Sequence, residues 1–428
     1  MPAMSSRTAT HLHNLMVVGV VTLGIAVGAA ATAQSPPTPV TRGGAFINIA
    51  IPTPIDGEEL DRYANTLQLD DGQRVVLVML YEEYLEEQAQ FQQEEIKRLW
   101  DSSATIAALG DLGRSVQTGD EFAALMRSRD RAVRRLAVID ERLFDRFTSH
   151  LSEWQVANIE QVRRQRIRVR CNTARSEYPG GTLDLVMLLH ECERVGYLEV
   201  LDGDTYGEIL LDYDTSVTPL FQRRYRAKLR AMADGPRILA AAWGNGDGEI
   251  DVTKRKEALD ERQRLRARHV HAAKQIRQMN ERYLGRLSDV LDERSIRVLK
   301  ERYLSEVYPP VYPDPNDISA LFKRIRGLET LTETQRDGIQ ALEATYWQRQ
   351  QHLSDRMVAH YLSWREEAAE RGWQHPDTRQ EYQDEMDRLG ARRLDNAISM
   401  KSQMKNLLSP AQLAQMDENH PAPVTKEK

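Results

Sequence analysis

Apolar residues recur at helical spacing along most of the chain, and the clearest run follows Leu331. There they fall in steps of three, four and seven residues, at Ile339, Leu342, Tyr346, Leu353, Met357, Tyr361 and Trp364. Such steps place one apolar stripe along one face of a helix. The run extends over about 35 residues, which predicts a helix roughly 50 Å long.

The same arrangement occurs earlier in the chain. Another stripe starts at Val76 and passes Leu80 and Tyr84 towards Trp100. Each long helix is followed by a stretch rich in glycine or polar residues, namely ALGDLGRSVQTGD, WGNGDGEID or RGWQHPD. A returning helix begins after each of these breaks. We therefore predict an all-α protein of three tandem long helical-hairpin units with no sheet.

Proline-rich joints, SEYPGGT and YPPVYPDPND, separate these units. The predicted order along the chain is a signal peptide at 1–33, a Pro-rich linker at 34–55, helical unit 1 at 56–170, a linker at 171–181, a divergent helical unit 2 at 182–307, a Pro-rich linker at 308–315, helical unit 3 at 316–416 and a polar tail at 417–428.

One short motif opens and closes each predicted unit. It is a leucine followed by Ser, Thr or Asp, and four copies have glutamine three residues after that polar residue: LDDGQ, LSEWQ, LTETQ and LSPAQ. The motif residues are Leu69, Asp70, Gln73, Leu151, Ser152, Gln155, Leu201, Asp202, Leu291, Asp292, Leu331, Thr332, Gln335, Leu408, Ser409 and Gln412. The opening leucines are nearly equally spaced, which indicates tandem duplication.

Ser, Thr or Asp with glutamine three residues later is a capping box. The polar side chain accepts a hydrogen bond from the backbone of the glutamine, and the glutamine side chain reaches back to the first residue of the box. Two backbone donors that a helix start leaves unpaired are thereby satisfied. In unit 2 the glutamine positions hold Thr205 and Ser295. We interpret all six motifs as structural helix caps.

The paired motif resembles that of exported helical proteins of the Spy and CpxP type. In that family Leu-Thr-x-x-Gln occurs twice per chain and opens and closes a bent helical hairpin. Units 1 and 3 match both copies, whereas unit 2 keeps only Leu201 and Leu291 with their caps. The resemblance implies a cradle-shaped helical fold, export to the envelope, and either ATP-independent chaperoning or restraint of an envelope stress sensor.

The N-terminal run LMVVGVVTLGIAVGAAA is apolar and is followed by Ala-Thr-Ala at 31–33. This arrangement is typical of a cleaved signal peptide. The alternative is an uncleaved anchor, for which the run is short and rich in glycine. No other segment is apolar enough to cross a bilayer. We expect a soluble exported protein, periplasmic or otherwise extracytoplasmic, that starts near Gln34.

The chain has 58 Lys and Arg residues against 64 Asp and Glu, a net charge of −6. This acidic balance argues against a nucleic-acid binder, whose domain would normally be basic. The local exception is VRRQRIRVR, which contains Arg163, Arg164, Arg166, Arg168 and Arg170. These arginines form either a solvated helix face or a surface for acidic clients or partners.

The chain contains two cysteines, Cys171 and Cys192. In an exported protein they are candidates for a disulfide. The alternative is two separate, half-buried thiols.

Signatures of enzymes are missing from the sequence, which has no Gly-x-Ser-x-Gly, P-loop or His-Glu-x-x-His motif. The stretch GNGDGEID lacks the carboxylates that a calcium loop needs at its first and last positions. His269 and His271 are two residues apart, so on a helix they point in different directions. We expect no catalytic residue, metal or cofactor.

Three functions fit these observations. The first is a chaperone-like protein that holds non-native clients on amphipathic helices without ATP. The alternatives are an envelope stress adaptor with one dedicated partner and a structural helical spacer. Protein clients or one envelope protein are the expected partners, and the sequence leaves the oligomeric state open.

Overall fold

The structure, a computed structural model, describes residues 51–103, 118–172, 178–198, 203–243, 251–371 and 376–418. Within these ranges the regular elements are all helices, without a strand, so the all-α prediction is confirmed. The predicted signal peptide, Leu201, Asp202 and the loop at 244–250 lie outside the described residues. Of the described helices, none is long and apolar enough to cross a membrane.

The chain divides into two compact units, Met1–Val162 and Arg163–Lys428. The first unit contains α2 (Gly57–Thr66), α3 (Asp71–Phe91), η1 (Gln92–Ile96) and α5 (Thr118–Thr148). Helix α6 (Glu153–Cys171) begins in the first unit and ends in the second. The second unit continues with α7 (Leu185–Arg194), α8 (Gly203–Trp243), α9 (Val252–Ser288), α10 (Glu293–Val307), α11 (Ser319–Arg326), α12 (Glu333–Arg371), α13 (Pro376–Leu407) and α14 (Pro410–Glu418).

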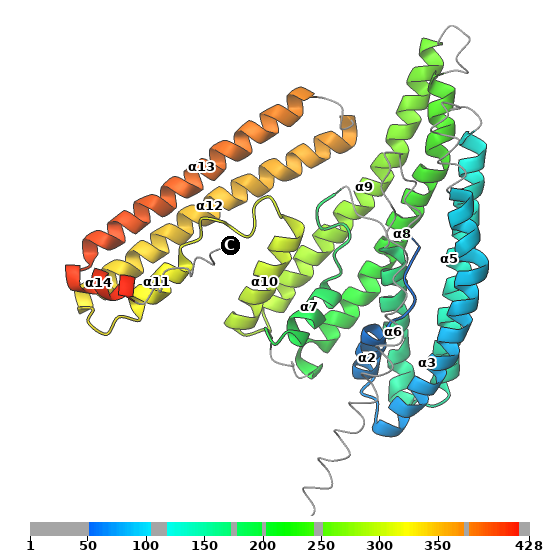
Figure 1. Ribbon diagram of the computed structural model, residues 1–428, viewed down its shortest axis with the longest axis horizontal. Helices are drawn as coiled ribbons and strands as arrows, with labels where there is room; N and C mark the ends of the chain where they lie inside the picture. Colours follow the sequence, from blue (N-terminus) through cyan, green and yellow to red (C-terminus); the bar gives the residue numbers. More distant parts are fainter. Residues whose placement is uncertain are drawn as a thin grey trace, which may run out of the picture. The chain divides into compact units, whose positions relative to one another are not determined.

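Three pairs of long helices pack side by side: α3 with α5, α8 with α9, and α12 with α13 (Figure 1). That the chain consists of three tandem hairpin units, copies of one repeated unit, stays a prediction. The second and third pairs belong to the same compact unit.

In the first unit, α3 and α5 are joined by a buried hydroxyl. The Tyr84 hydroxyl donates to Asp140 Oδ1 at 3.0 Å and accepts from the backbone of Ile55 at 2.8 Å. The residue that ends the predicted linker at 34–55 is thus packed into the unit. Helix α3 passes directly into the π-helical turn η1, which no sequence pattern predicted.

The second unit has a large apolar core that includes residues from α7, α8, α9 and α10 together with Leu353, Met357, Tyr361, Tyr382, Met386 and Leu389 of α12 and α13. A smaller core lies around Phe322, Tyr346 and Met400, towards the end of the α12–α13 pair that carries the motifs. The shared core explains why two hairpins form one compact unit.

The Pro-rich segment 308–315, predicted as a linker, is packed into this unit. Tyr308 and Val311 are buried in the large core. Arg393 of α13 donates to the Val311 carbonyl at 2.8 Å and forms an ion pair with Asp314 at 2.9 Å. The segment therefore fixes the start of the third hairpin against the second.

Candidate functional site

The four intact motifs form both bonds of the capping box. At Asp70 the Gln73 N–H donates to the Asp70 carboxylate at 2.8 Å, and the Asp70 N–H donates to Gln73 Oε1 at 3.2 Å. At Thr332 the corresponding distances to Gln335 are 3.2 and 3.0 Å. The boxes at Ser152 and Ser409 are closed in the same way.

The two glutamines of the first unit also bond to each other. Gln73 Nε2 donates to Gln155 Oε1 at 2.7 Å, and Gln155 Nε2 donates to Gln73 Oε1 at 2.8 Å. Each amide has a second N–H, which Gln73 gives to the His150 carbonyl and Gln155 to the Leu67 carbonyl, both at 3.0 Å. The opening and closing motifs of this unit therefore form a single hydrogen-bonded cluster.

The third hairpin repeats this geometry. Gln335 Nε2 and Gln412 Nε2 donate to each other's Oε1 at 3.0 and 3.1 Å. Their second N–H groups bond the Leu407 and Thr330 carbonyls at 2.7 and 2.9 Å. Each glutamine oxygen thus accepts two bonds and each nitrogen donates two, which uses the full capacity of the amide.

The middle hairpin lacks the glutamine pair because Thr205 and Ser295 stand at those positions. Asp292 still caps α10, accepting from the backbones of Arg294 and Ser295 at 2.9 and 3.0 Å. The hydrogen bonds from Ser295 and Arg294 lower the pKa of the Asp292 carboxyl. The hydroxyl of Tyr283 and the guanidinium of Arg286 both bond Asp212 and thereby tie α9 to α8.

The motif leucines anchor these helix starts in the apolar interior. Leu69, Leu291, Leu331 and Leu408 are buried, whereas Leu151 is half-buried. The described copies of the motif therefore combine a polar helix cap with an apolar anchor.

We predict that the Gln335–Gln412 pair contributes a measurable coupling energy. Either Gln→Ala change removes one bond of the capping box and both hydrogen bonds to the partner glutamine. Each change should therefore lower the unfolding free energy by ~2 kcal/mol. The double variant should cost less than the sum of the two, by ~1 kcal/mol.

The measurement is a double-mutant cycle by urea unfolding. Gln380→Ala is the matched control, because Gln380 is exposed and bonds only to Asp384 on its own helix among the contacts described. Strict additivity of the two changes would show that the pair carries no coupling.

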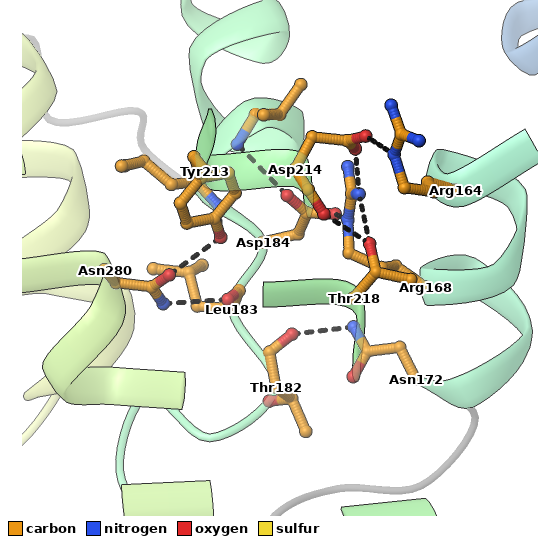
Figure 2. A network of polar contacts seen from close by, with 12 residues as sticks. Arg164, Arg168, Asn172, Thr182, Leu183, Asp184, Tyr213, Asp214, Thr218 and Asn280 are labelled. Atoms are coloured by element: carbon orange, nitrogen blue, oxygen red, sulfur yellow. Dashed lines mark hydrogen bonds and ion pairs between the residues drawn. The ribbon is translucent and has the colours of Figure 1, made fainter. Parts of the chain in front are cut away.

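The predicted arginine surface was wrong. Arg166, Arg168 and Arg170 are buried, and Arg163 and Arg164 are half-buried. Two of these charges are neutralised by partners distant in sequence. Arg168 Nε donates to Asp184 at 2.5 Å, and Arg168 and Arg164 both pair with Asp214 (Figure 2).

Burial by itself disfavours the charged form of Arg168, which exposes 1% of its surface. The attraction of Asp184 and Asp214 outweighs burial and raises the pKa of Arg168 above its ordinary value. Thr218 Oγ1 accepts a further bond from Arg168 at 3.0 Å. The guanidinium is therefore held as a cation that links α6, the start of α7, and α8.

Neutral bonds extend this network towards α9 (Figure 2). The Tyr213 hydroxyl donates to Asn280 Oδ1 at 2.8 Å and accepts from the Leu185 N–H at 2.9 Å. Asn280 Nδ2 in turn donates to the Leu183 carbonyl at 2.8 Å. Burial raises the pKa of Tyr213, so this hydroxyl stays protonated as a donor.

Sequence reasoning missed Asp184, Tyr213, Asp214 and Asn280. The available signal was a carboxylate within the apolar run ILLDYDTSV, where a solvated charge is out of place. The network organises the joint between α6 and the second hairpin, so its role is structural.

We predict that Arg168→Ala destabilises the second unit by ~3–5 kcal/mol, because it leaves Asp184 and Asp214 buried without their cation. The matched control is Arg302→Ala, which removes an exposed pair with Glu191 and should cost no more than ~1 kcal/mol. Thermal and urea unfolding measure both. Equal costs for the two variants would contradict the structural role of the network.

The predicted disulfide is not formed in the structure. Cys171 and Cys192 are free thiols, both buried in the large core of the second unit. Each fills space among apolar side chains as a small hydrophobic residue. Burial raises the pKa of the Cys171 thiol to about 11 and also raises that of Cys192, which disfavours the reactive thiolate.

We therefore predict that neither thiol reacts with a maleimide at pH 7 in the folded protein and that both react after unfolding in urea. Intact mass measured without reductant should count two alkylated cysteines in the unfolded sample. If the unfolded chain takes up no reagent before reduction and two equivalents after it, the two cysteines form a disulfide and the prediction is wrong.

No group of three or more His, Cys, Asp or Glu side chains able to hold a metal occurs within the described ranges. His269 is buried and His271 is exposed, so the two do not share a site. The absence of catalytic function stays a prediction.

Comparisons of the chain with protein-family models, with curated proteins and with solved structures find no match. The resemblance to Spy and CpxP proteins therefore stays at the level of the motif and the helical pattern.

Proposed function

We propose that this chain is an exported, ATP-independent, chaperone-like protein that holds non-native proteins on amphipathic helical surfaces. The proposal includes delivery to the periplasm or another extracytoplasmic space by the predicted signal at 1–33. It also includes three tandem copies of one hairpin, each with its own outward surface.

The observation that carries the proposal is an exposed apolar stripe on α3. Val75, Val78 and Met79 expose 62%, 45% and 62% of their surfaces. Their spacing of three and four residues places them on one face of the helix. An apolar row of this kind on a soluble surface marks an interaction site better than single apolar residues do.

The rest of this helix face is acidic. Glu82, Glu83 and Glu86 are exposed one to two turns further on. Glu83 pairs with Arg146 of α5 at 2.5 Å. An apolar row next to a charged one suits segments of unfolded chains, which contain both kinds of side chain, and it resists association of the row with its own copies.

The stripe begins two residues after Gln73, so the glutamine pair holds the helix turn on which it lies. A preordered apolar surface loses little conformational entropy when a client binds. Exposed apolar residues also occur on the other long pairs, with Val252 and Leu259 on α9 and Leu394 and Ile398 on α13. Because exposed apolar residues occur on several helices, one unfolded client could contact the protein at several weak sites at once.

The test is an aggregation assay with the chain from residue 34 and several unrelated unfolding substrates. We expect suppression of aggregation at stoichiometric amounts without ATP. The triple variant Val75→Ser, Val78→Ser and Met79→Ser should lose about half or more of this activity while its unfolding free energy changes little, because the three side chains are already exposed.

A second variant, Leu394→Ser with Ile398→Ser, changes exposed apolar residues on another helix pair and should lose less activity than the triple variant, because the stripe on α3 is the main client surface. Loss of activity only in this second variant would move the client surface to α13. No suppression by the unmodified chain with any substrate would reject the chaperone proposal. A single stoichiometric partner in a pull-down would then favour the adaptor.

A further inference from the structure

A cavity of about 310 Å³ opens between α8 and α9. Four nitrogen-bearing and three apolar side chains line it: Lys228, Arg262, Arg266 and His269, with Ala231, Met232 and Leu265. No carboxylate belongs to this lining. The volume is about ten times the share of one molecule in liquid water, so the cavity has room for more than a bridging water.

His269 is the buried wall of this cavity. It exposes 5% of its surface, and its Nε2 has no hydrogen-bond partner in the part of the chain that the structure describes. Buried polar side-chain atoms are nearly always paired, with protein, water or ligand. The ring nitrogen faces a cavity with room for a partner larger than water.

The surroundings of the ring determine the charge of that partner. Burial lowers the pKa of His269 most, and Arg224, Lys228 and Arg266 lower it further, to about 3. The ring is thus neutral at physiological pH and lies in a region of positive potential. A cation or metal ion would be repelled here, whereas an anion would be attracted.

From the cavity, its basic lining and the unpaired Nε2, we propose that the α8–α9 pair binds a small oxyanion carrying an apolar group, such as an alkyl phosphate. Nε2–H of His269 donates to the oxyanion, while Lys228 and the two arginines lining the cavity supply the opposite charge. Leu265, Met232 and Ala231 contact the apolar group.

This site is separate from client holding. None of its lining residues is among the exposed apolar residues of the proposed client surface on α3, α9 and α13. The ligand site can therefore exist in a protein with no chaperone activity, and the reverse is equally possible.

The test is a titration of the chain from residue 34, labelled with ¹⁵N-histidine and followed through the ring signals of His269 and by calorimetry. The probes are octyl phosphate, inorganic phosphate and octanol. We expect octyl phosphate to shift the His269 signals and to bind about tenfold or more tightly than inorganic phosphate, because it adds apolar contact. Octanol should not bind.

Two variants identify the site. Arg262→Ala should weaken octyl phosphate binding about fivefold, whereas Arg264→Ala should leave it unchanged. The two arginines are exposed on the same helix, but only Arg262 lines the cavity, and Arg264 pairs with Glu261. His269→Phe keeps a ring of similar size, removes the unpaired nitrogen, and should weaken binding about tenfold while the protein stays folded.

A competition arm separates two sources of the same chemistry. Vesicles containing phosphatidic acid that displace octyl phosphate would assign the site to a lipid headgroup, and vesicles that do not would assign it to a free phosphate ester. The proposal is overturned if no phosphate probe shifts the His269 signals at 10 mM, or if Arg262→Ala and Arg264→Ala weaken binding equally.

Discussion

The start of a helix leaves backbone N–H groups without partners. In two of the three hairpins, the glutamine side chain that bonds such an N–H group also bonds the glutamine at the other end of the hairpin. Gln73 and Gln155 each cap their own helix and bond each other, as do Gln335 and Gln412. Local helix initiation and the meeting of two distant segments thus depend on the same amides. Because the glutamine pair fixes where the helices of a hairpin begin, it also fixes the position of the exposed stripe at the start of α3.

The joint between α6 and the middle hairpin is held by charge instead. The middle hairpin lacks the two glutamines, and its joint with α6 contains buried ions, among them Arg168 between Asp184 and Asp214. Such a cluster is a costly way to gain stability, because each ion loses its hydration. It does impose one arrangement, since any shift of the joint would leave a charge unpaired. The hairpin without the glutamine pair is therefore joined to α6 by a cluster that fixes one arrangement.

Helical periodicity and the capping boxes were readable from the sequence because both depend on residues within a few positions of each other. The glutamine pairs could not be predicted in this way. Nothing in the opening motif LTETQ indicates that it lies beside the closing motif LSPAQ. The arginines of VRRQRIRVR looked solvated because their partners Asp184 and Asp214 are distant in sequence. Likewise Cys171 and Cys192 suggested a bond, whereas their surroundings make them packing residues. Local chemistry was predictable, and long-range pairing was not.

The paired glutamines also bear on how the chain reaches its folded state. The bonded amides are separated by 82 positions in the first hairpin and by 77 in the third. Closing loops of this length has a modest entropic cost that grows slowly with size. Each of these hairpins can therefore close as soon as its own second motif is available, without waiting for the remainder of the chain. A polypeptide that emerges progressively from its N-terminus would complete one hairpin before the next is present.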